Sequence, residues 1–198
     1  GFFVLRMGKV VEAPLISSKK EIIDYAYKKI GNDFLDVYLG AKCHMCLSTG
    51  NGFDAIPALF RRPVSFVNYL PIEAPFSSKN YIAYLSKAHF DAKTGKQLSL
   101  KQIIDLKLTY ITSTDTYKTN DIILKENSPE EIRDVAVETV ERLQGTWRSD
   151  SVGENLQDKF RQIMPLTLRD DRGRPLHGEF FIRYSENFLK DNPWWVEQ

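Results

Sequence analysis

The stretch from Cys43 to Leu70, CHMCLSTGNGFDAIPALFRRPVSFVNYL, decides the fold class. Its first part, Cys43–Ser48, is a mostly apolar run that predicts a strand. The glycine-containing turn Thr49–Gly52 leads into a short helix over Phe53–Arg61, and Pro63–Leu70 is a second strand of β-branched and aromatic residues. Nearly continuous apolar strands joined through a helix are typical of a parallel sheet that is covered on both faces.

The segment before this stretch extends the same pattern. Phe2–Arg6 is an apolar run that predicts an opening strand, followed by a turn at Met7–Lys9. Ser18 stands three residues before Glu21, a capping box that predicts a helix ending at Gly31, and a further helix is expected over residues 33–41. Right-handed crossovers would place the turns after the first and second strands at the same carboxyl edge of one sheet.

The segment after this stretch is richer in helix signals. Residues 71–87 are expected to be a loop, and residues 91–97 a polar turn centred on Gly95. Helix starts or apolar stripes predict helices over residues 99–106, 128–143, 151–164 and 179–190. We therefore predict an α/β protein with a Rossmann-like domain over residues 1–145 and a helical C-terminal extension over residues 146–198.

Composition limits the classes of function. The chain has 198 residues, with 27 Lys and Arg against 26 Asp and Glu, so it lacks the basic field of a protein that tracks nucleic acid. No apolar run approaches the roughly 18 residues that span a bilayer, and two cysteines form no disulfide framework, which favours a reducing cytoplasm. The opening GFFVLR predicts a strand already under way, so the chain is expected to be the C-terminal part of something longer.

The turn after the second strand is the leading candidate site. Ser48, Thr49, Gly50, Asn51 and Gly52 combine side-chain donors with two glycines that let a ligand approach the backbone. The turn opens a helix, whose N-terminus carries about half a positive elementary charge. These are the parts of a phosphate site. The alternative is a plain strand-to-helix turn, in which Gly and Asn are common.

Four other residues could contribute to that site. Arg6, followed by Gly8, could contact a diphosphate in a bidentate manner, or could instead pair with a local acid such as Asp36. Asp54 could favour the helix dipole or accept from ribose or sugar hydroxyls. Asn68, near the end of the Pro63–Leu70 strand, is another candidate at the same edge.

The remaining candidate side chains, two cysteines and three tryptophans, are expected to pack in the core rather than to carry chemistry. Cys43 and Cys46 are three apart in a predicted strand, so they point to opposite faces and cannot chelate one ion. No metal and no cofactor are predicted. Trp147, Trp194 and Trp195 are expected to be packing anchors.

Four stretches resemble one family of bacterial glycosyltransferases associated with surface-polysaccharide gene clusters. They are FFVLRMG, LSTGNGFDAIPALFRRPVSFVN, SPEEIRDVAVETVERLQGTW and the terminal NPWW, and the similarity covers nearly the whole chain. The resemblance implies a GT-B architecture of two Rossmann-like domains, of which this chain is the C-terminal, donor-binding half. It implies transfer of a sugar from a nucleoside diphosphate sugar to a glycan or lipid-linked acceptor, in the cytoplasm or peripherally at the inner face of the membrane.

The family pattern also assigns roles to residues. It places the donor diphosphate on Ser48–Gly52, makes Arg6 the basic residue that neutralises the leaving diphosphate, and suggests Asp54 for the ribose, although Asp54 comes earlier than usual. The acceptor domain, which usually supplies the catalytic base, would be a separate N-terminal domain that is missing here, so this chain alone could bind without turnover. The alternatives are a sugar-nucleotide epimerase and a non-catalytic module that binds a nucleotide or a protein, with residues 75–120 as its interaction surface.

Overall fold

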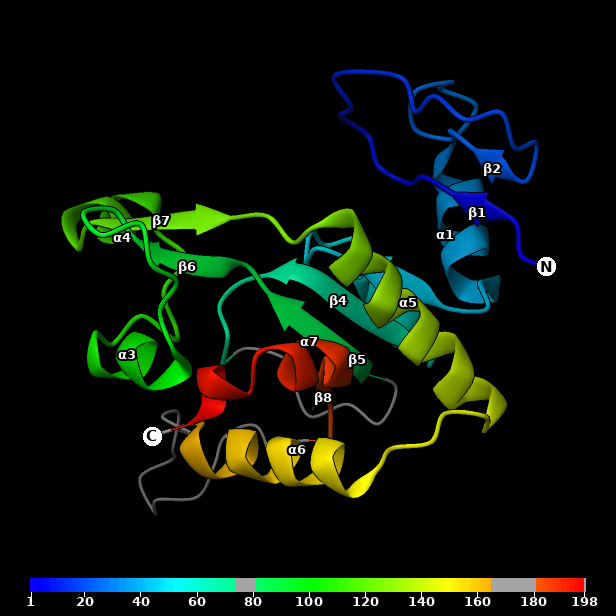
Figure 1. Ribbon diagram of the computed structural model, residues 1–198. Helices are drawn as coiled ribbons and strands as arrows, with labels where there is room; N and C mark the ends of the chain where they lie inside the picture. Colours follow the sequence, from blue (N-terminus) through cyan, green and yellow to red (C-terminus); the bar gives the residue numbers. More distant parts are fainter. Residues whose placement is uncertain (74–80, 165–180, 198) are drawn as a thin grey trace, which may run out of the picture.

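A four-stranded parallel sheet forms the centre of the protein. The computed structural model describes residues 1–73, 81–164 and 181–197 (Figure 1). Strands β3 (Cys46–Ser48), β4 (Val64–Tyr69), β5 (Tyr81–Ser86) and β8 (Arg183–Tyr184) lie in the order β3-β4-β5-β8, each parallel to its neighbour. Helix α2 (Ala55–Leu59) connects β3 to β4. The expected α/β class with a parallel sheet flanked by helices is confirmed.

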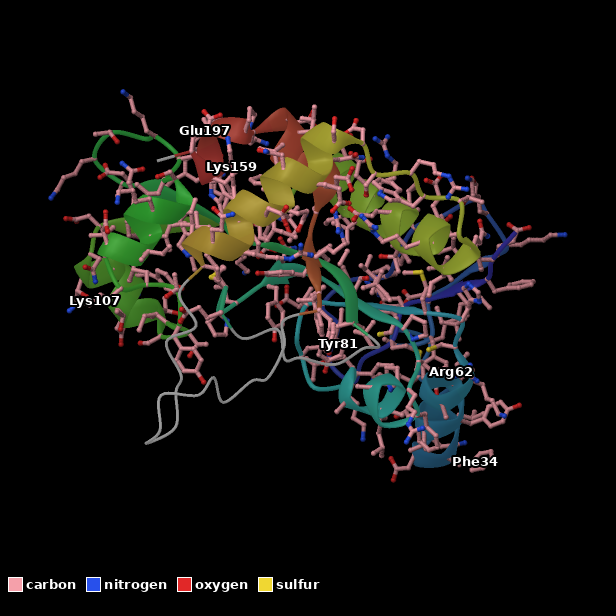
Figure 2. The ribbon with its side chains drawn as sticks, turned by 90° about the horizontal axis from the view of Figure 1, so that it is seen from below. Phe34, Arg62, Tyr81, Lys107, Lys159 and Glu197 are labelled. Atoms are coloured by element: carbon pink, nitrogen blue, oxygen red, sulfur yellow. The ribbon has the colours of Figure 1, made fainter. Side chains whose placement is uncertain are left out.

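Helices cover the main sheet from both sides. Helices α5 (Pro129–Gln144), α6 (Ser151–Ile163) and α7 (Glu186–Asp191) lie on one side, as Figures 1 and 2 show, whereas α2 lies on the other. Helix α5 begins and ends as its sequence predicts. Ser128 and Glu131 form a capping box, and Gly145 ends the helix with a left-handed φ of 70°.

Aromatic side chains dominate the core between the sheet and α6. Tyr84 and Tyr184 pack edge to face with ring centroids 4.9 Å apart, and Trp195 of the short 3-10 helix η1 (Pro193–Val196) stacks on Tyr184 at 4.6 Å. Phe160 of α6 lies 4.9 Å from the Tyr184 ring. Trp195 is thus a packing anchor as predicted, while Trp194 remains 40% exposed.

Two fully buried glutamates connect the helices on this side. Glu138 of α5 and Glu186 of α7 share Arg142, whose Nε lies 2.8 Å from Glu138 and whose Nη2 lies 3.0 Å from Glu186. Glu186 also accepts from the Trp147 indole and the Ser149 hydroxyl. Because buried carboxylates need such partners, this cluster ties α5 and α7 to the loop that precedes α6.

A small lobe is inserted between β5 and α5. Strands β6 (Ala88–Asp91) and β7 (Ile122–Lys125) pair antiparallel, and helices α3 (Leu100–Asp105) and α4 (Thr114–Thr119) lie between them in the chain. The Ser99–Gln102 capping box begins α3 as predicted. Figure 1 shows this lobe at the end of the molecule opposite the N-terminus.

The N-terminal segment forms a separate lobe. Strands β1 (Val4–Leu5) and β2 (Ile22–Ile23) pair in parallel and, within the described part of the chain, with no other strand; helix α1 (Asp33–Lys42) follows. The expectation that Phe2–Arg6 belongs to the main sheet is therefore wrong. The helix predicted over residues 18–31 is also wrong, because Ile22 and Ile23 pair with β1 instead.

Two further differences concern the C-terminal half. Residues 81–86, expected to be loop, form the central strand β5, because the run YIAYLS has the apolar and aromatic side chains of a buried strand. The helix predicted over 179–190 is replaced by β8 and α7, and residues 179 and 180 lie outside the described residues. The segment 146–198 thus adds a strand to the sheet rather than being purely helical. Within the described ranges, none of the helices has the length and apolar character needed to cross a bilayer.

Candidate functional site

The turn after β3 is closed by its own side chains. Gly50 and Gly52 have left-handed φ values of 77° and 92°, which glycine adopts without strain. The Ser48 hydroxyl accepts from the Gly50 amide at 3.0 Å and donates to Asp54 Oδ1 at 3.0 Å. The Gly52 amide donates to the same carboxylate oxygen at 3.1 Å, and Asn51 Oδ1 accepts from the amide of residue 53 at 3.3 Å.

Asp54 has a structural role that the sequence did not predict, at its position directly before α2. Its carboxylate points back into the turn, where it accepts from Ser48 and Gly52, and it makes no side-chain cap bond to α2. It occupies one of the amides that a phosphate oxygen would use. A phosphate at this turn would have to share or displace that contact, while Thr49 remains exposed beside it.

An aromatic group borders the turn at the carboxyl edge of the sheet. A Cβ on Gly50 would lie 2.8 Å from the Tyr69 ring, so only glycine permits this approach. Burial, followed by the nearby charges of Asp54, Tyr81 and Tyr110, raises the pKa of Tyr69 to about 12. Figure 2 shows Tyr81 on the same side of the sheet as α2. The sequence prediction missed Tyr69, since only the fold brings its ring to the turn.

Asn68 makes hydrogen bonds within the protein through both its side chain and its backbone N–H. It has a left-handed φ of 52° at the end of β4, and its side-chain oxygen accepts the backbone N–H of Asn127. Asn127 Oδ1 in turn accepts the Asn68 amide at 2.6 Å, and Asn127 Nδ2 donates to the Ser86 carbonyl at 2.9 Å. Asn68 therefore joins β4 to the start of α5, close to the edge where a ligand was expected.

Arg6 lies in the N-terminal lobe and is already paired. Its guanidinium makes two contacts with Asp24, at 2.8 Å and 2.7 Å, and also donates to the Ala13 carbonyl. Although desolvation opposes it, hydrogen bonds from the Leu15 amide and Arg6 lower the pKa of Asp24. The local-acid alternative is thus correct in kind, with Asp24 in place of Asp36, which instead accepts from the Tyr25 hydroxyl.

The predicted meeting of Arg6 with the glycine turn is therefore wrong. Strand β1 pairs only with β2, so the sheet that carries the turn does not include it. Gly8 follows Arg6 in the same lobe with a left-handed φ of 139°, and no atom lies within 4 Å of a Cβ built on it. It turns the chain and forms no part of the turn after β3.

A basic residue that the sequence prediction missed does lie at the carboxyl edge. Lys87 follows β5, and its amide donates to the Tyr69 carbonyl at 3.3 Å. Its ammonium group contacts Glu126 at 2.6 Å, with 28% of the side chain exposed. The topology thus brings a lysine to the same carboxyl edge as the turn, with β4 between them, although nothing in the local sequence around Lys87 signals it.

The two cysteines are free, partly buried thiols. Cys43 caps the C-terminus of α1 and donates to the Gly40 carbonyl at 3.2 Å, whereas Cys46 begins β3. Cys43 lies outside β3, so the prediction that both cysteines lie on one strand and point to opposite faces is wrong. Burial raises the pKa of Cys46 to about 12 and also raises that of Cys43. Within the described ranges, no group of three or more His, Cys, Asp or Glu is placed to hold a metal ion.

No family model, no curated protein and no solved structure matches this chain. The geometry described above is therefore the basis for the proposals that follow.

Proposed function

We propose that this chain binds the diphosphate of a nucleoside diphosphate sugar at the carboxyl edge of the main sheet, as the donor-binding half of a glycosyltransferase. The observation that supports this is the turn between β3 and α2. It combines two left-handed glycines, Gly50 and Gly52, with the place where open α/β sheets bind their ligands. Together with the sequence resemblance, this position favours a phosphorylated sugar donor.

In this proposal the turn supplies backbone amides and the edge supplies charge. The exposed Thr49 approaches the diphosphate, the Gly50 and Gly52 amides turn to it from Ser48 and Asp54, and Asp54 keeps the empty turn in shape through Ser48. Lys87, rather than Arg6, is the basic residue that neutralises the leaving diphosphate, since it lies at this edge. In glycosyl transfer the bond from the sugar anomeric carbon to the diphosphate oxygen breaks while an acceptor oxygen bonds to that carbon. Preorganised donors at the leaving diphosphate lower the barrier to this step.

A second candidate is a binding module without catalysis. It is favoured by the closed hydrogen bonding of the turn, in which Ser48 and the Asp54 carboxylate already occupy the amides of Gly50 and Gly52. Such a module would bind a nucleotide weakly, or would use the turn only to shape the surface. Incubation of the chain with a donor sugar distinguishes these activities. Free nucleoside diphosphate indicates transfer or hydrolysis, an isomeric sugar indicates epimerisation, and the absence of both products indicates binding without catalysis.

Calorimetry with UDP-, GDP- and CDP-linked sugars tests the site. Thr49→Glu places a carboxylate in the turn without disturbing a described hydrogen bond, and we expect at least about a tenfold loss of affinity from charge repulsion. Thr119→Glu, exposed on α4 in the small lobe, is the matched control and should bind as the parent does. The proposal fails if the parent binds none of these ligands, or if Thr49→Glu binds them unchanged.

A further inference from the structure

The loop between β1 and β2 exposes two aliphatic side chains almost completely. Val10 and Ile16 are each 92% exposed, the largest values among the exposed apolar side chains of the described residues. Figure 1 shows this loop, in dark blue, at the end of the N-terminal lobe farthest from the main sheet. Single exposed apolar residues are ordinary, but two on one projecting loop indicate a surface that contacts something other than water.

The loop is held in place by a partly buried ion pair at its base, Arg6 with Asp24. Arg6 donates to the Ala13 carbonyl at 2.8 Å, and the Leu15 amide donates to the Asp24 carboxylate at 2.7 Å. Asp24 is itself paired with Arg6, so one ion pair fixes the chain on both sides of residue 14. Because the backbone is anchored at Ala13 and Leu15, Ile16 follows a fixed segment of the loop. This reduces the conformational entropy that is lost when the loop docks.

Positive charge gathers in the same lobe. Residues 1–32 contain six basic residues and three acids, a net charge of +3, whereas the whole chain carries +1, so residues 33–198 sum to −2. Arg6 and Asp24 neutralise each other. What remains is two glutamates, Glu12 and Glu21, and five exposed lysines: Lys9, Lys19, Lys20, Lys28 and Lys29. Lys9 contacts the exposed Asp33 of α1 at 3.6 Å, and the other four lysines have no ion pair among the described residues.

We propose that the N-terminal lobe docks on an anionic lipid bilayer through residues 7–20. Val10 and Ile16 enter the boundary between headgroups and acyl chains, and Lys9, Lys19 and Lys20 contact the lipid phosphates. Exposed aliphatic side chains flanked by lysines suit such a surface, because the apolar groups leave water while the ammonium groups remain at the headgroups.

Charge decides between lipid and a second copy of the chain. Two copies meeting through this loop would bring lysines against lysines, which opposes association, whereas an anionic surface neutralises them. A second copy is the outcome that gel filtration of the chain without lipid would detect. The inference needs neither the glycine turn nor a nucleotide, so it stands or falls separately from the proposed function.

Vesicle co-sedimentation of the whole chain tests this proposal. We expect binding to vesicles of phosphatidylglycerol and phosphatidylcholine in equal parts, weaker binding to phosphatidylcholine alone, and a decline with added salt. Val10→Ser with Ile16→Ser should reduce binding at least about tenfold, and Lys19→Gln with Lys20→Gln should reduce it chiefly at low salt. The matched controls are Val152→Ser, 59% exposed on α6, and Lys101→Gln with Lys118→Gln, exposed on α3 and α4.

Thermal unfolding followed by circular dichroism verifies that each variant remains folded, and Ile16→Trp gives an independent readout. The emission of the introduced tryptophan, taken as the difference from the parent, should shift to shorter wavelength with anionic vesicles and not with neutral ones. Absence of vesicle binding, equal binding to both lipids, or binding that survives loss of Val10 and Ile16 would overturn the proposal. So would dimers in gel filtration without lipid that disappear in the Val10 and Ile16 variant, because they would identify a second copy as the occupant.

Discussion

Asn68 and Asn127 hold the end of β4 and the start of α5 together through a reciprocal pair of hydrogen bonds. Each side-chain oxygen accepts the backbone N–H of the other residue, and the remaining amide group of Asn127 donates to the Ser86 carbonyl at the end of β5. Two strands and one helix therefore meet at one largely buried residue, beside the edge that carries the candidate site.

Asn127→Ala should destabilise the protein by about 2–4 kcal/mol, since it removes two side-chain hydrogen bonds and leaves the Asn68 amide and the Ser86 carbonyl without these partners, while the backbone N–H of residue 127 keeps its bond to Asn68. Urea unfolding measures this change in the free energy of unfolding. Asn155→Ala, at an exposed position within α6, is the control and should leave the stability nearly unchanged. A loss of under about 0.5 kcal/mol in Asn127→Ala would show that the contacts are not formed in solution.

Arg142→Met should cost more than any exposed charge substitution. It removes the guanidinium that the fully buried Glu138 and Glu186 share. Glu186 keeps Lys190 at 3.0 Å, whereas Glu138 loses its charged partner, and breaking such a buried pair costs about 3–5 kcal/mol. Glu138→Gln should cost less, because burial already raises the pKa of that carboxyl and disfavours its charge. Chemical denaturation of both variants gives the comparison.

The control for that comparison is Arg133→Met. Arg133 lies on α5 with 66% of its side chain exposed and contacts only its neighbour Asp134 in the described structure, so its loss should change stability by less than about 1 kcal/mol. Similar losses for Arg142→Met and Arg133→Met would mean that the buried glutamates find other partners.

Local signals in the sequence predicted helix ends but not the partition into lobes. Ser128 followed by Glu131 and Ser18 followed by Glu21 present the same capping pattern, and only the first begins a helix. The second fails because Ile22 and Ile23 pair with β1, a contact with residues far away in the sequence. Strand β5 was missed for a related reason, since proline and serine upstream of Tyr81 suggested a loop.

The candidate site was likewise predictable in its local residues but not in its partners from other strands. The turn from Ser48 to Gly52 follows from residues that are adjacent in the chain, and it lies where it was expected. The partners of that turn depend on which strands share a sheet. Arg6 was assigned to it because β1 was expected in the main sheet, whereas Tyr69 and Lys87 reach the edge through the pairing of β4 with β5.

Arg6→Ala should loosen the loop over residues 7–20 and leave nucleotide affinity unchanged. Without the guanidinium, Asp24 loses its charged partner and the Ala13 carbonyl loses a donor. Hydrogen exchange followed by mass spectrometry should then show faster exchange at Leu15, whose amide donates to Asp24. Lys9→Ala, with 80% of its side chain exposed, is the control. Weaker nucleotide binding in Arg6→Ala would restore the diphosphate role first assigned to it.

The protein should lose stability as the pH falls from about 6.5 to 4 because of His89. This side chain is 1% exposed beside the Tyr117 ring, and its Nε2 is buried without a hydrogen-bond partner among the residues that the structure describes. Burial lowers the pKa of His89 to about 4. A group whose pKa is lower in the folded state binds fewer protons there than in the unfolded chain. Its full contribution is present above pH 6.5 and declines on acidification, by up to about 3 kcal/mol.

Denaturant unfolding across this pH range measures the effect. His89→Phe keeps an aromatic ring against Tyr117 but cannot take up a proton, so it should flatten the dependence on pH, even though loss of the bond from Nδ1 to the Lys87 carbonyl lowers the stability at neutral pH. His44→Gln, at an exposed position before β3, should retain the slope of the parent. If His89→Phe keeps that slope as well, the protons are taken up elsewhere, and His89 is not the residue that makes the fold sensitive to acid.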